Sequence, residues 1–258
     1  ATPKECFQYA ADSFDIADRL QTPVIVMSDL ELGMNEQICD QLVWDDKRVY
    51  DRGKVLTSDQ LEEIEGYGRY QDVDADGIPY RTYPGTNANK GSYFTRGSSH
   101  DANAAYTEDG NVYAEVMDRL ARKFKTALTY LPEPEISDMK KEKLGIVFIG
   151  STNIVIQEVL DDLGKKDLSL DTMCIKAFPF HKSVKTFIDN HDLVYVIDQN
   201  RDAQLKSLLK LESNINEEKM DTYFEYLSTF FWLPLVIKIK EAPIKGINII
   251  AERIGKFI

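Results

Sequence analysis

Hydrophobic residues recur at helical spacing in two long stretches of the chain. In residues 5–20 they form one apolar face, and the segment 21–23 (QTP) ends the pattern. In residues 112–131 they form a second apolar stripe, and we expect the basic residues of this stretch to lie on the opposite, solvated side: Arg119, Arg122, Lys123 and Lys125. The pattern predicts two amphipathic helices.

Between these helices the pattern changes. The run 24–27 (VIVM) is continuously apolar, which is typical of a strand buried on both faces of a parallel sheet. Ser28 and Asp29 follow this predicted strand, at the strand end where ligands bind in open α/β sheets. Residues 30–110 are rich in charge and poor in apolar runs, so we expect a long loop excursion with one short helix near 58–64.

The second half of the chain alternates strand and helix patterns. Strands are predicted at 144–149, 170–177, 193–197 and 235–239, and helices at 154–163, 184–188, 205–209 and 247–258. Such alternation predicts an α/β fold with a parallel sheet flanked by helices. Residues 132–142 are rich in proline and charge, so we expect them to link two domains, residues 1–131 and 143–258.

The segment 77–101 has no helical or strand period but is dense in Gly, Pro, hydroxyl, aromatic and arginine residues. Core packing does not explain this composition, so we expect the segment to bind a ligand or a partner. A guanidinium matches a carboxylate or phosphate in a bidentate way, which makes Arg81 and Arg96 the main candidates. Interface cores are also enriched in arginine and aromatic residues, so a subunit interface is slightly preferred over a ligand site. The same segment contributes three more candidates: Tyr83, Thr95 and His100.

Two polar turns follow predicted strands. Residues 198–202 (DQNRD) are five consecutive polar residues, more than helix capping requires, so Asn200 and Arg201 are candidates for binding or for interdomain contacts. Residues 150–153 (GSTN) place backbone amides at the start of a helix, where an anion can bind. An ordinary capped turn is the preferred interpretation of this second segment.

A calcium-like pattern leads into the segment 77–101. Asp72, Asp74, Asp76 and Gly77 match positions 1, 3, 5 and 6 of an EF-hand loop. The match fails at position 12, where Tyr83 replaces a bidentate glutamate, so calcium binding is only an alternative. The histidines do not stand at ligand spacing from one another or from a cysteine, and we expect no metal site.

The overall composition narrows the function class. The chain has 258 residues, 43% of them hydrophobic, and a net charge of −12. We expect no nucleic-acid groove, because a basic stripe is lacking, and no membrane span, because no apolar run is long enough. Cys6, Cys39 and Cys174 stand far apart, which favours free thiols in a cytoplasmic protein. The chain begins Ala-Thr-Pro without an initiator Met, so we expect it to be the back portion of a longer polypeptide.

Five segments together resemble one protein family. They are 22–29 (TPVIVMSD), 76–86 (DGIPYRTYPGT), 90–97 (KGSYFTRG), 106–109 (YTED) and 196–205 (VIDQNRDAQL). These residues are similar to the α subunit of 2-oxoacid:ferredoxin oxidoreductases, and the similarity covers most of residues 1–212. It departs at residues 230–239 (FFWLPLVIKI), where the family carries a Tyr-Asp-Gly-x-Pro-Ile-Thr segment. By this resemblance, residues 1–131 look like the later part of the thiamine-pyrimidine domain, and residues 143–258 look like core domain II, which is related to the transketolase C-terminal domain.

The resemblance also implies an activity. Members of the family decarboxylate a 2-oxoacid such as pyruvate or 2-oxoglutarate on thiamine diphosphate, pass electrons through an iron–sulfur cluster to ferredoxin, and release an acyl-CoA. The diphosphate–Mg²⁺ site and the cluster lie on the partner β subunit, so we expect this chain to bind no cofactor alone and to be inactive alone. A dimer of αβ heterodimers is implied, with 2-oxoglutarate or a similar 2-oxoacid as substrate. A non-catalytic assembly module of such a complex is the alternative.

Overall fold

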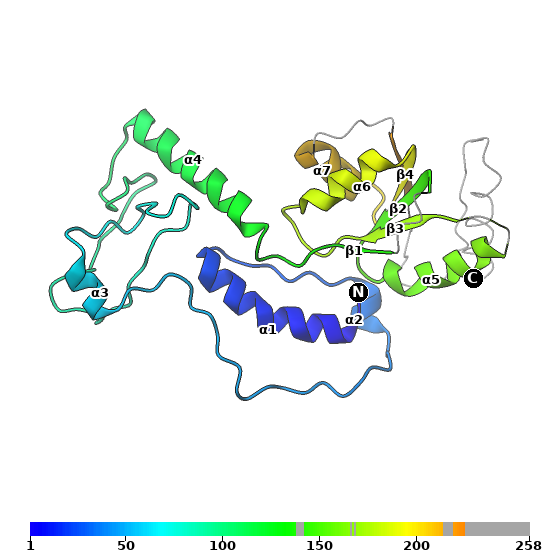
Figure 1. Ribbon diagram of the computed structural model, residues 1–258, viewed down its shortest axis with the longest axis horizontal. Coiled ribbons are helices and arrows are strands. Elements are labelled where there is room, and N and C mark those ends of the chain that lie inside the picture. The colour runs from blue at the N-terminus through cyan, green and yellow to red at the C-terminus, as the bar shows by residue number, and fades with distance from the viewer. Residues whose placement is uncertain (138–141, 166, 168, 214–218, 225–258) are drawn as a thin grey trace. The chain divides into compact units, whose positions relative to one another are not determined.

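The chain folds into two compact units in the computed structural model (Figure 1). The structure describes residues 1–137, 142–165, 167, 169–213 and 219–224. Unit 1 comprises Ala1–Cys6, Ser28–Cys39 and Pro132–Ile258, and unit 2 comprises Phe7–Met27 and Asp40–Leu131. Helices and a sheet with mainly parallel pairing make up the chain, so the predicted α/β class is confirmed.

Within the described residues, unit 1 is built on a five-stranded sheet. In spatial order the strands are β1 (Glu135–Ile136), β3 (Asp171–Cys174), β2 (Leu144–Phe148), β4 (Leu193–Asp198) and β5 (Met220–Phe224). β3, β2, β4 and β5 run parallel, whereas β1 pairs antiparallel with β3 at one edge. The three strands predicted near residues 144, 170 and 193 are therefore present.

Helices cover both faces of the sheet in unit 1. Alternate residues of each strand point to opposite faces, so each strand contributes apolar side chains to a core on either side. The helices of this unit are α2 (Leu30–Met34), α5 (Thr152–Gly164), α6 (Lys182–Asn190) and α7 (Gln204–Ser213). Val147 and Val194 share one core cluster with residues of α6 and α7. Ile146 and Phe148 share the other cluster with Ile156 of α5.

Two strands of the sheet differ from the sequence-based expectation. β1 lies within residues 132–142, interpreted above as a linker, and its pairing with β3 makes it part of unit 1. β5 lies in a stretch where the sequence predicts no strand. Its pairing with β4, which identifies it as a strand, is a long-range contact that the local pattern does not reveal. The strand predicted at 235–239 and the helix predicted at 247–258 lie outside the described residues.

Unit 2 is organised around two long helices and the excursion between them. Its helices are most of α1 (Pro3–Leu20), α3 (Ser58–Glu63) and α4 (Gly110–Ala127). α3 begins at a capping box formed by Thr57 and Gln60, and α4 begins at Asp109, whose carboxylate accepts a hydrogen bond from Asn111 N. Both amphipathic helices and the short helix are thus confirmed. Among the described residues, the buried apolar cluster of unit 2 is small: Leu20, Ile78 and Ala127, with Ile16 and Leu131 against them.

The predicted buried strand at 24–27 is wrong. This segment has no regular secondary structure, and the side chains of Ile25 and Met27 are 79% and 81% exposed. A strand buried on both faces needs a paired neighbour and helices over it. None of the described strands pairs with this segment, so its apolar residues are left in solvent.

The expected orientation of α4 is confirmed for Arg122 and Lys125, which are exposed, and is wrong for Arg119 and Lys123. Arg119 is only 8% exposed and donates through Nη1 to Gly77 O at 2.9 Å. Lys123 is partly buried and donates through Nζ to Thr22 Oγ1 at 2.6 Å. On the apolar stripe, by contrast, Phe124 is 49% exposed. Arg119 and Lys123 turn inward because Gly77 O and Thr22 Oγ1 accept hydrogen bonds from them, and a helical pattern by itself does not reveal such partners.

Candidate functional site

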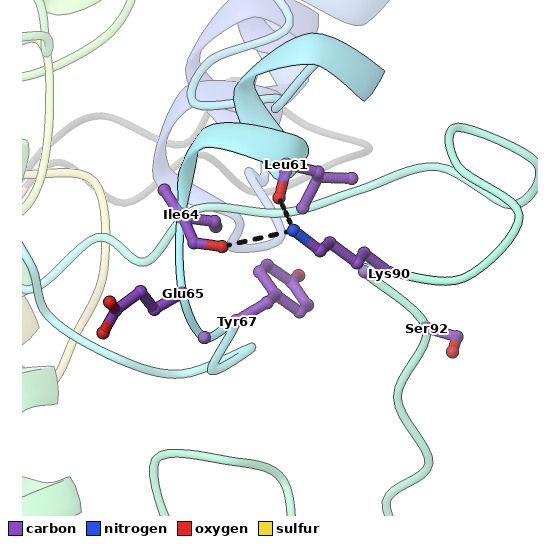
Figure 2. Close-up of a pocket in the computed structure, with 8 residues that line it drawn as sticks. Leu61, Ile64, Glu65, Tyr67, Lys90 and Ser92 are labelled. Atoms are coloured by element: carbon purple, nitrogen blue, oxygen red, sulfur yellow. Dashed lines mark hydrogen bonds between the residues drawn. The ribbon is translucent and has the colours of Figure 1, made fainter.

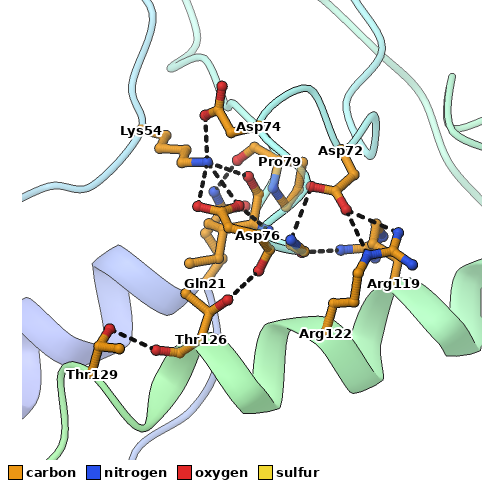
Figure 3. A network of polar contacts seen from close by, with 12 residues as sticks. Gln21, Lys54, Asp72, Asp74, Asp76, Pro79, Arg119, Arg122, Thr126 and Thr129 are labelled. Carbon is orange, nitrogen blue, oxygen red and sulfur yellow. Dashed lines mark hydrogen bonds and ion pairs between the residues drawn. The ribbon is translucent and has the colours of Figure 1, made fainter.

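The acidic loop that leads into residues 77–101 surrounds the ammonium group of Lys54 (Figure 3). Lys54 Nζ lies 2.6 Å from Asp74 Oδ2, 2.8 Å from Asp76 Oδ2 and 3.0 Å from Ile78 O. Burial lowers the pKa of Lys54, but hydrogen bonds to Asp74 and Asp76 outweigh it and raise the pKa overall. The hydrogen bond from Lys54 is also the main reason that the pKa of Asp74 is lowered.

The first acidic residue of this loop has other partners. Asp72 Oδ2 accepts two hydrogen bonds from Arg122, at 2.9 and 3.1 Å, and Asp72 Oδ1 accepts one from Gly77 N at 2.9 Å. The three carboxylates of the loop therefore do not converge on one point. Within the described residues, no group of His, Cys, Asp and Glu side chains is arranged to hold a metal ion.

Arg81, the first of the two arginine candidates, is engaged within unit 2. Its Nη2 lies 3.0 Å from Asp18 Oδ1 on α1 and donates to Arg52 O at 2.8 Å. Its backbone N–H donates to Lys54 O at 2.9 Å, and its guanidinium lies 5.4 Å from the ring centre of Tyr83. The carboxylate that meets this guanidinium belongs to α1 and not to a ligand or partner.

The other candidates of the segment 77–101 lie in different surroundings. Arg96 and Thr95 are exposed, and no hydrogen bond or ion pair joins Arg96 to another described residue. Tyr83 is 45% exposed. The ring of His100 stacks on Tyr70 with a centroid distance of 3.9 Å, and its Nδ1 lies 3.0 Å from the backbone carbonyl of the next residue. Of these side chains, that of Arg96 is therefore a charged group left open to a ligand or partner.

A small pocket opens beside the same segment (Figure 2). It has a volume of about 200 Å³ and is lined by Leu61, Ile64, Glu65, Gly66, Tyr67, Lys90, Gly91 and Ser92. Lys90 Nζ donates to Leu61 O and Glu62 O, each at 3.1 Å, and so closes the carboxyl end of α3. Glu62 Oε2 lies 3.2 Å from the same ammonium. Because the charge of Lys90 is already paired, the carboxylate of Glu65 is the remaining charged group in the lining of this pocket.

In unit 1, the turn that follows β2 already holds a carboxylate. Asp29 Oδ2 accepts a hydrogen bond from Ser151 N at 2.6 Å, and its Oδ1 caps α2 through Leu32 N at 3.0 Å. Burial raises the pKa of Asp29, but these hydrogen bonds outweigh it and lower the pKa overall. Gly150 has φ +60°, and a Cβ there would lie 2.4 Å from Asp29 Oδ2. The anion position considered above as the alternative for residues 150–153 is thus filled from within the chain.

The polar turn after β4 forms the start of α7. Asn200 Nδ2 donates to Asp198 Oδ1 at 2.9 Å, and Asp198 Oδ2 accepts from Leu205 N at 2.8 Å. The amide oxygen of Asn200 accepts from Asp202 N at 3.0 Å. Arg201 is exposed and pairs with Asp202, with Nε 2.8 Å from Oδ1. Capping accounts for Asn200 here, whereas Arg201 and Asp202 are exposed to solvent.

A buried charge cluster in unit 1 has no counterpart in the sequence analysis. The side chain of Lys176 is 4% exposed, and its Nζ lies 2.6 Å from Glu5 Oε1 and 3.0 Å from Glu135 Oε2. Burial lowers the pKa of Lys176, but hydrogen bonds to both glutamates outweigh it and raise the pKa strongly. Burial also raises the pKa of the nearby Cys174 thiol. Nothing in the spacing of these residues connects position 5 with position 176.

Comparison with known proteins identifies relatives of the chain. No family model matches it. A curated protein, the α subunit of 2-oxoacid:ferredoxin oxidoreductase 2 from Aeropyrum pernix, is 27% identical over 221 residues, which are 83% of this chain and 33% of that protein. The resemblance to 2-oxoacid:ferredoxin oxidoreductase α subunits is confirmed. The chain spans about a third of the length of this α subunit.

Comparison with solved structures shows one protein of related fold. The 2-oxoglutarate:ferredoxin oxidoreductase from Magnetococcus marinus, solved with 2-oxoglutarate, coenzyme A and succinyl-CoA bound, has a TM-score of 0.61 and 22% identity. The match covers 81% of this chain and 35% of that one. An α chain of a probable 2-oxoacid ferredoxin oxidoreductase from Thermoplasma acidophilum is 27% identical over 33% of this chain and 74% of its own, with a TM-score of 0.22, which is too low to support a fold argument.

Proposed function

We propose that this chain is part of the α subunit of a 2-oxoacid:ferredoxin oxidoreductase, an enzyme that converts a 2-oxoacid and CoA to an acyl-CoA and passes electrons to ferredoxin. The observation that carries the proposal is the similarity over 221 residues to an α subunit of this class. 2-Oxoglutarate is the first substrate to test, because the solved structure of related fold contains it. Three free thiols suit a protein of the reducing cytoplasm.

We assign thiamine diphosphate, Mg²⁺ and the iron–sulfur cluster to sites completed or supplied by a partner β subunit. A cluster takes four thiolates, whereas the cysteines here are one exposed, one half-buried and one buried residue: Cys39, Cys6 and Cys174. The described carboxylates form no group suited to Mg²⁺. The residues present do not fit these cofactors, so no catalytic step is assigned to them, and the chain alone is expected to be inactive. A dimer of αβ heterodimers is the proposed assembly.

We propose that residues 1–131 are the later part of the thiamine-pyrimidine domain and that residues 143–258 are core domain II, with 132–142 between them. The parallel pairing of β2, β3, β4 and β5 supports the second assignment, because the transketolase C-terminal-like domain is of α/β type. The excursion 30–110 belongs to the first domain and carries the surface that we assign to ligand or partner contact.

Arg96 is the side chain on which we centre that contact. It is exposed and stands beside Thr95 and Phe94, which is 81% exposed. A free guanidinium next to an exposed ring is typical of a site that recognises a carboxylate, a phosphate or a partner surface. Arg81 has a supporting role, because its guanidinium is already bound by Asp18.

The test is to produce the full polypeptide with its β subunit and to measure viologen reduction that depends on a 2-oxoacid and CoA. We expect turnover with 2-oxoglutarate, pyruvate or a branched-chain 2-oxoacid. Absence of turnover with all three, in a complex that binds thiamine diphosphate, would contradict the proposed activity. In the same complex, Arg96→Ala is expected to lower kcat/KM or to weaken subunit association, whereas the matched change Lys47→Ala, at an exposed cation of the same unit, leaves both unchanged.

A second candidate function is a non-catalytic assembly module of such a complex, and the exposed apolar face of α4 favours it. Tyr113 and Phe124 on this face are 51% and 49% exposed. We expect Phe124→Asp to weaken association with the β subunit, measured by analytical ultracentrifugation, because it puts a charge into an apolar contact. The matched control is Val49→Asp, at a residue 90% exposed outside the long helices. An assembly module requires that Arg96→Ala change association only and leave the turnover of assembled complex intact.

A further inference from the structure

Three cations of unit 2 lie together beside the acidic loop. They are Arg69, which precedes the loop in sequence, and Arg119 and Lys123 of α4. Burial, together with Arg119 and Arg69, lowers the pKa of Lys123, so the three positive charges act on one another. Among the described residues, no ion pair joins any of the three to an aspartate or a glutamate. The cluster therefore carries charge that its neighbours do not balance.

The two arginines of this cluster hold N–H groups that have no acceptor. Arg119 is 8% exposed and donates through Nη1 to Gly77 O, but its Nε is shielded from solvent and has no hydrogen-bond partner. Arg69 donates through Nη2 to Gln21 Oε1 at 2.7 Å, whereas its Nε and Nη1 are shielded from solvent without a partner. Such groups are rare in folded proteins, because they have lost water and gained no acceptor in return.

The ring of Tyr70 brings the two guanidiniums together. The guanidinium carbon of Arg69 lies 4.9 Å from the ring centre, and that of Arg119 lies 5.8 Å from it. The ring attracts both cations but supplies no net negative charge. Lys123 lies one helical turn after Arg119, with Nζ 2.6 Å from Thr22 Oγ1. Because Arg69 and Lys123 are only partly buried, an ion can approach the cluster from solvent.

One carboxylate acts on the cluster, and its oxygens are already used. Burial lowers the pKa of Arg119, and the negative charge of Asp72 opposes this only in part. Asp72 Oδ2 accepts hydrogen bonds from Arg122 at 2.9 and 3.1 Å, and its Oδ1 accepts one from Gly77 N (Figure 3). With Arg122 included, four cations thus share one carboxylate, and the excess of positive charge favours a further anion.

We propose that Arg69, Arg119 and Lys123 form a binding site for a small oxyanion, either phosphate or the carboxylate of a small organic acid. Guanidinium N–H groups match the oxygens of such an ion, and the ammonium adds a further donor and a further charge. The oxyanion supplies acceptors for the shielded N–H groups and removes the repulsion among the three cations. It also ties the segment of Arg69 to α4.

The test compares thermal unfolding of the full 258-residue chain in sodium phosphate, sodium acetate and sodium chloride at pH 7 and equal ionic strength. We expect a Kd of about 1 mM or below, so about 20 mM phosphate should raise the melting temperature by about 3–7 °C over chloride. Equal ionic strength is needed because salt also screens repulsion within the cluster.

Two variants separate binding from the general stabilisation of proteins by phosphate. Lys123→Met is expected to fold, because burial and two neighbouring cations oppose the charge that it removes, and to keep less than about a third of the gain. The matched control Lys125→Met, at an exposed lysine of the same helix, is expected to keep the whole gain.

Hydrogen exchange with mass spectrometry locates the effect. In the parent chain we expect phosphate to slow exchange of residues 66–72 and 115–126 by about threefold or more, and Lys123→Met to abolish this slowing. A response to phosphate but not to acetate assigns the site to phosphate, and the reverse assigns it to a carboxylate. Equal gains in the parent chain and Lys123→Met, or no gain over chloride with either oxyanion, would overturn the proposal.

Discussion

Gly77 offers the sharpest test of how the acidic loop packs on α4. It has φ +81°, and a Cβ built on it would lie 2.3 Å from Lys123 N and 2.6 Å from Arg119 O. Gly77→Ala therefore adds two penalties, about 1–2 kcal/mol for the left-handed backbone and about 1–3 kcal/mol for displacing helix backbone. We expect unit 2 to lose about 2–5 kcal/mol of local stability.

Gly85→Ala is the matched control, because Gly85 has φ +85° and nothing within 4 Å of its built Cβ. It should cost only the backbone penalty of about 1–2 kcal/mol. Hydrogen exchange with mass spectrometry over residues 110–127 measures the difference where the clash lies. We expect exchange of α4 to be about 5- to 150-fold faster in Gly77→Ala than in Gly85→Ala, which corresponds to about 1–3 kcal/mol. Equal exchange of α4 in the two variants would refute the packing argument.

Three further predictions concern charged groups. Lys176→Met should destabilise unit 1 by about 1–3 kcal/mol, measured by urea unfolding, because it leaves the carboxylate of Glu5 half-buried without its cation. The pKa of Asp29 is lowered on folding, so its contribution is fully present above its ordinary pKa of 3.8 and is lost as pH falls below it; Asp29→Asn should flatten that acid loss in a pH series of melting temperatures. Burial, with Arg119 nearby, lowers the pKa of Lys123, so Lys123→Met should stabilise unit 2 by about 1 kcal/mol at pH 7, and the gain should shrink as pH approaches 10.5. A loss of stability in Lys123→Met at pH 7, measured by hydrogen exchange of α4, would contradict this last assignment.

The sequence predicts which segments of this chain are regular but not which faces they bury. α1 and α4 lie where the helical spacing of apolar residues places them. The spacing also predicts a solvated Arg119, and this residue is 8% exposed because Gly77 O, 42 positions earlier, accepts its hydrogen bond. A helical pattern distinguishes an apolar from a polar face of the helix. It does not show which segments pack against each face. The run 24–27 fails for a related reason, since burial of a strand is a property of its neighbours.

For the candidate site, the sequence predicts the charge of the group that each motif binds but not the identity of that group. Arg81 does bind a carboxylate, but that carboxylate is Asp18 of α1. The turn at Ser151 does hold an anion, but that anion is the side chain of Asp29. The calcium-like loop does surround a cation, but that cation is Lys54. In each case the local motif predicts which kind of group is bound there. Only the tertiary structure shows that this group comes from another segment of the same chain.

These contacts between segments of the same chain indicate the role of the excursion, residues 30–110, in unit 2. The acidic face of α1 is bound by arginines of the excursion, with Arg48 Nη2 2.8 Å from Asp12 and 2.7 Å from Asp15. The basic face of α4 is bound by the acidic loop. Asp12, Asp15 and Asp18 of α1 are thus paired with arginines, and Arg119 of α4 is turned inward. Both helices leave apolar side chains open, with Phe14 64% exposed and Phe124 49% exposed. Uncovered apolar surface on two long helices favours contact with further protein. We propose that, in the α subunit, residues 30–110 form a polar layer that fixes both helices and leaves apolar side chains such as Phe14 and Phe124 free for contact with further protein.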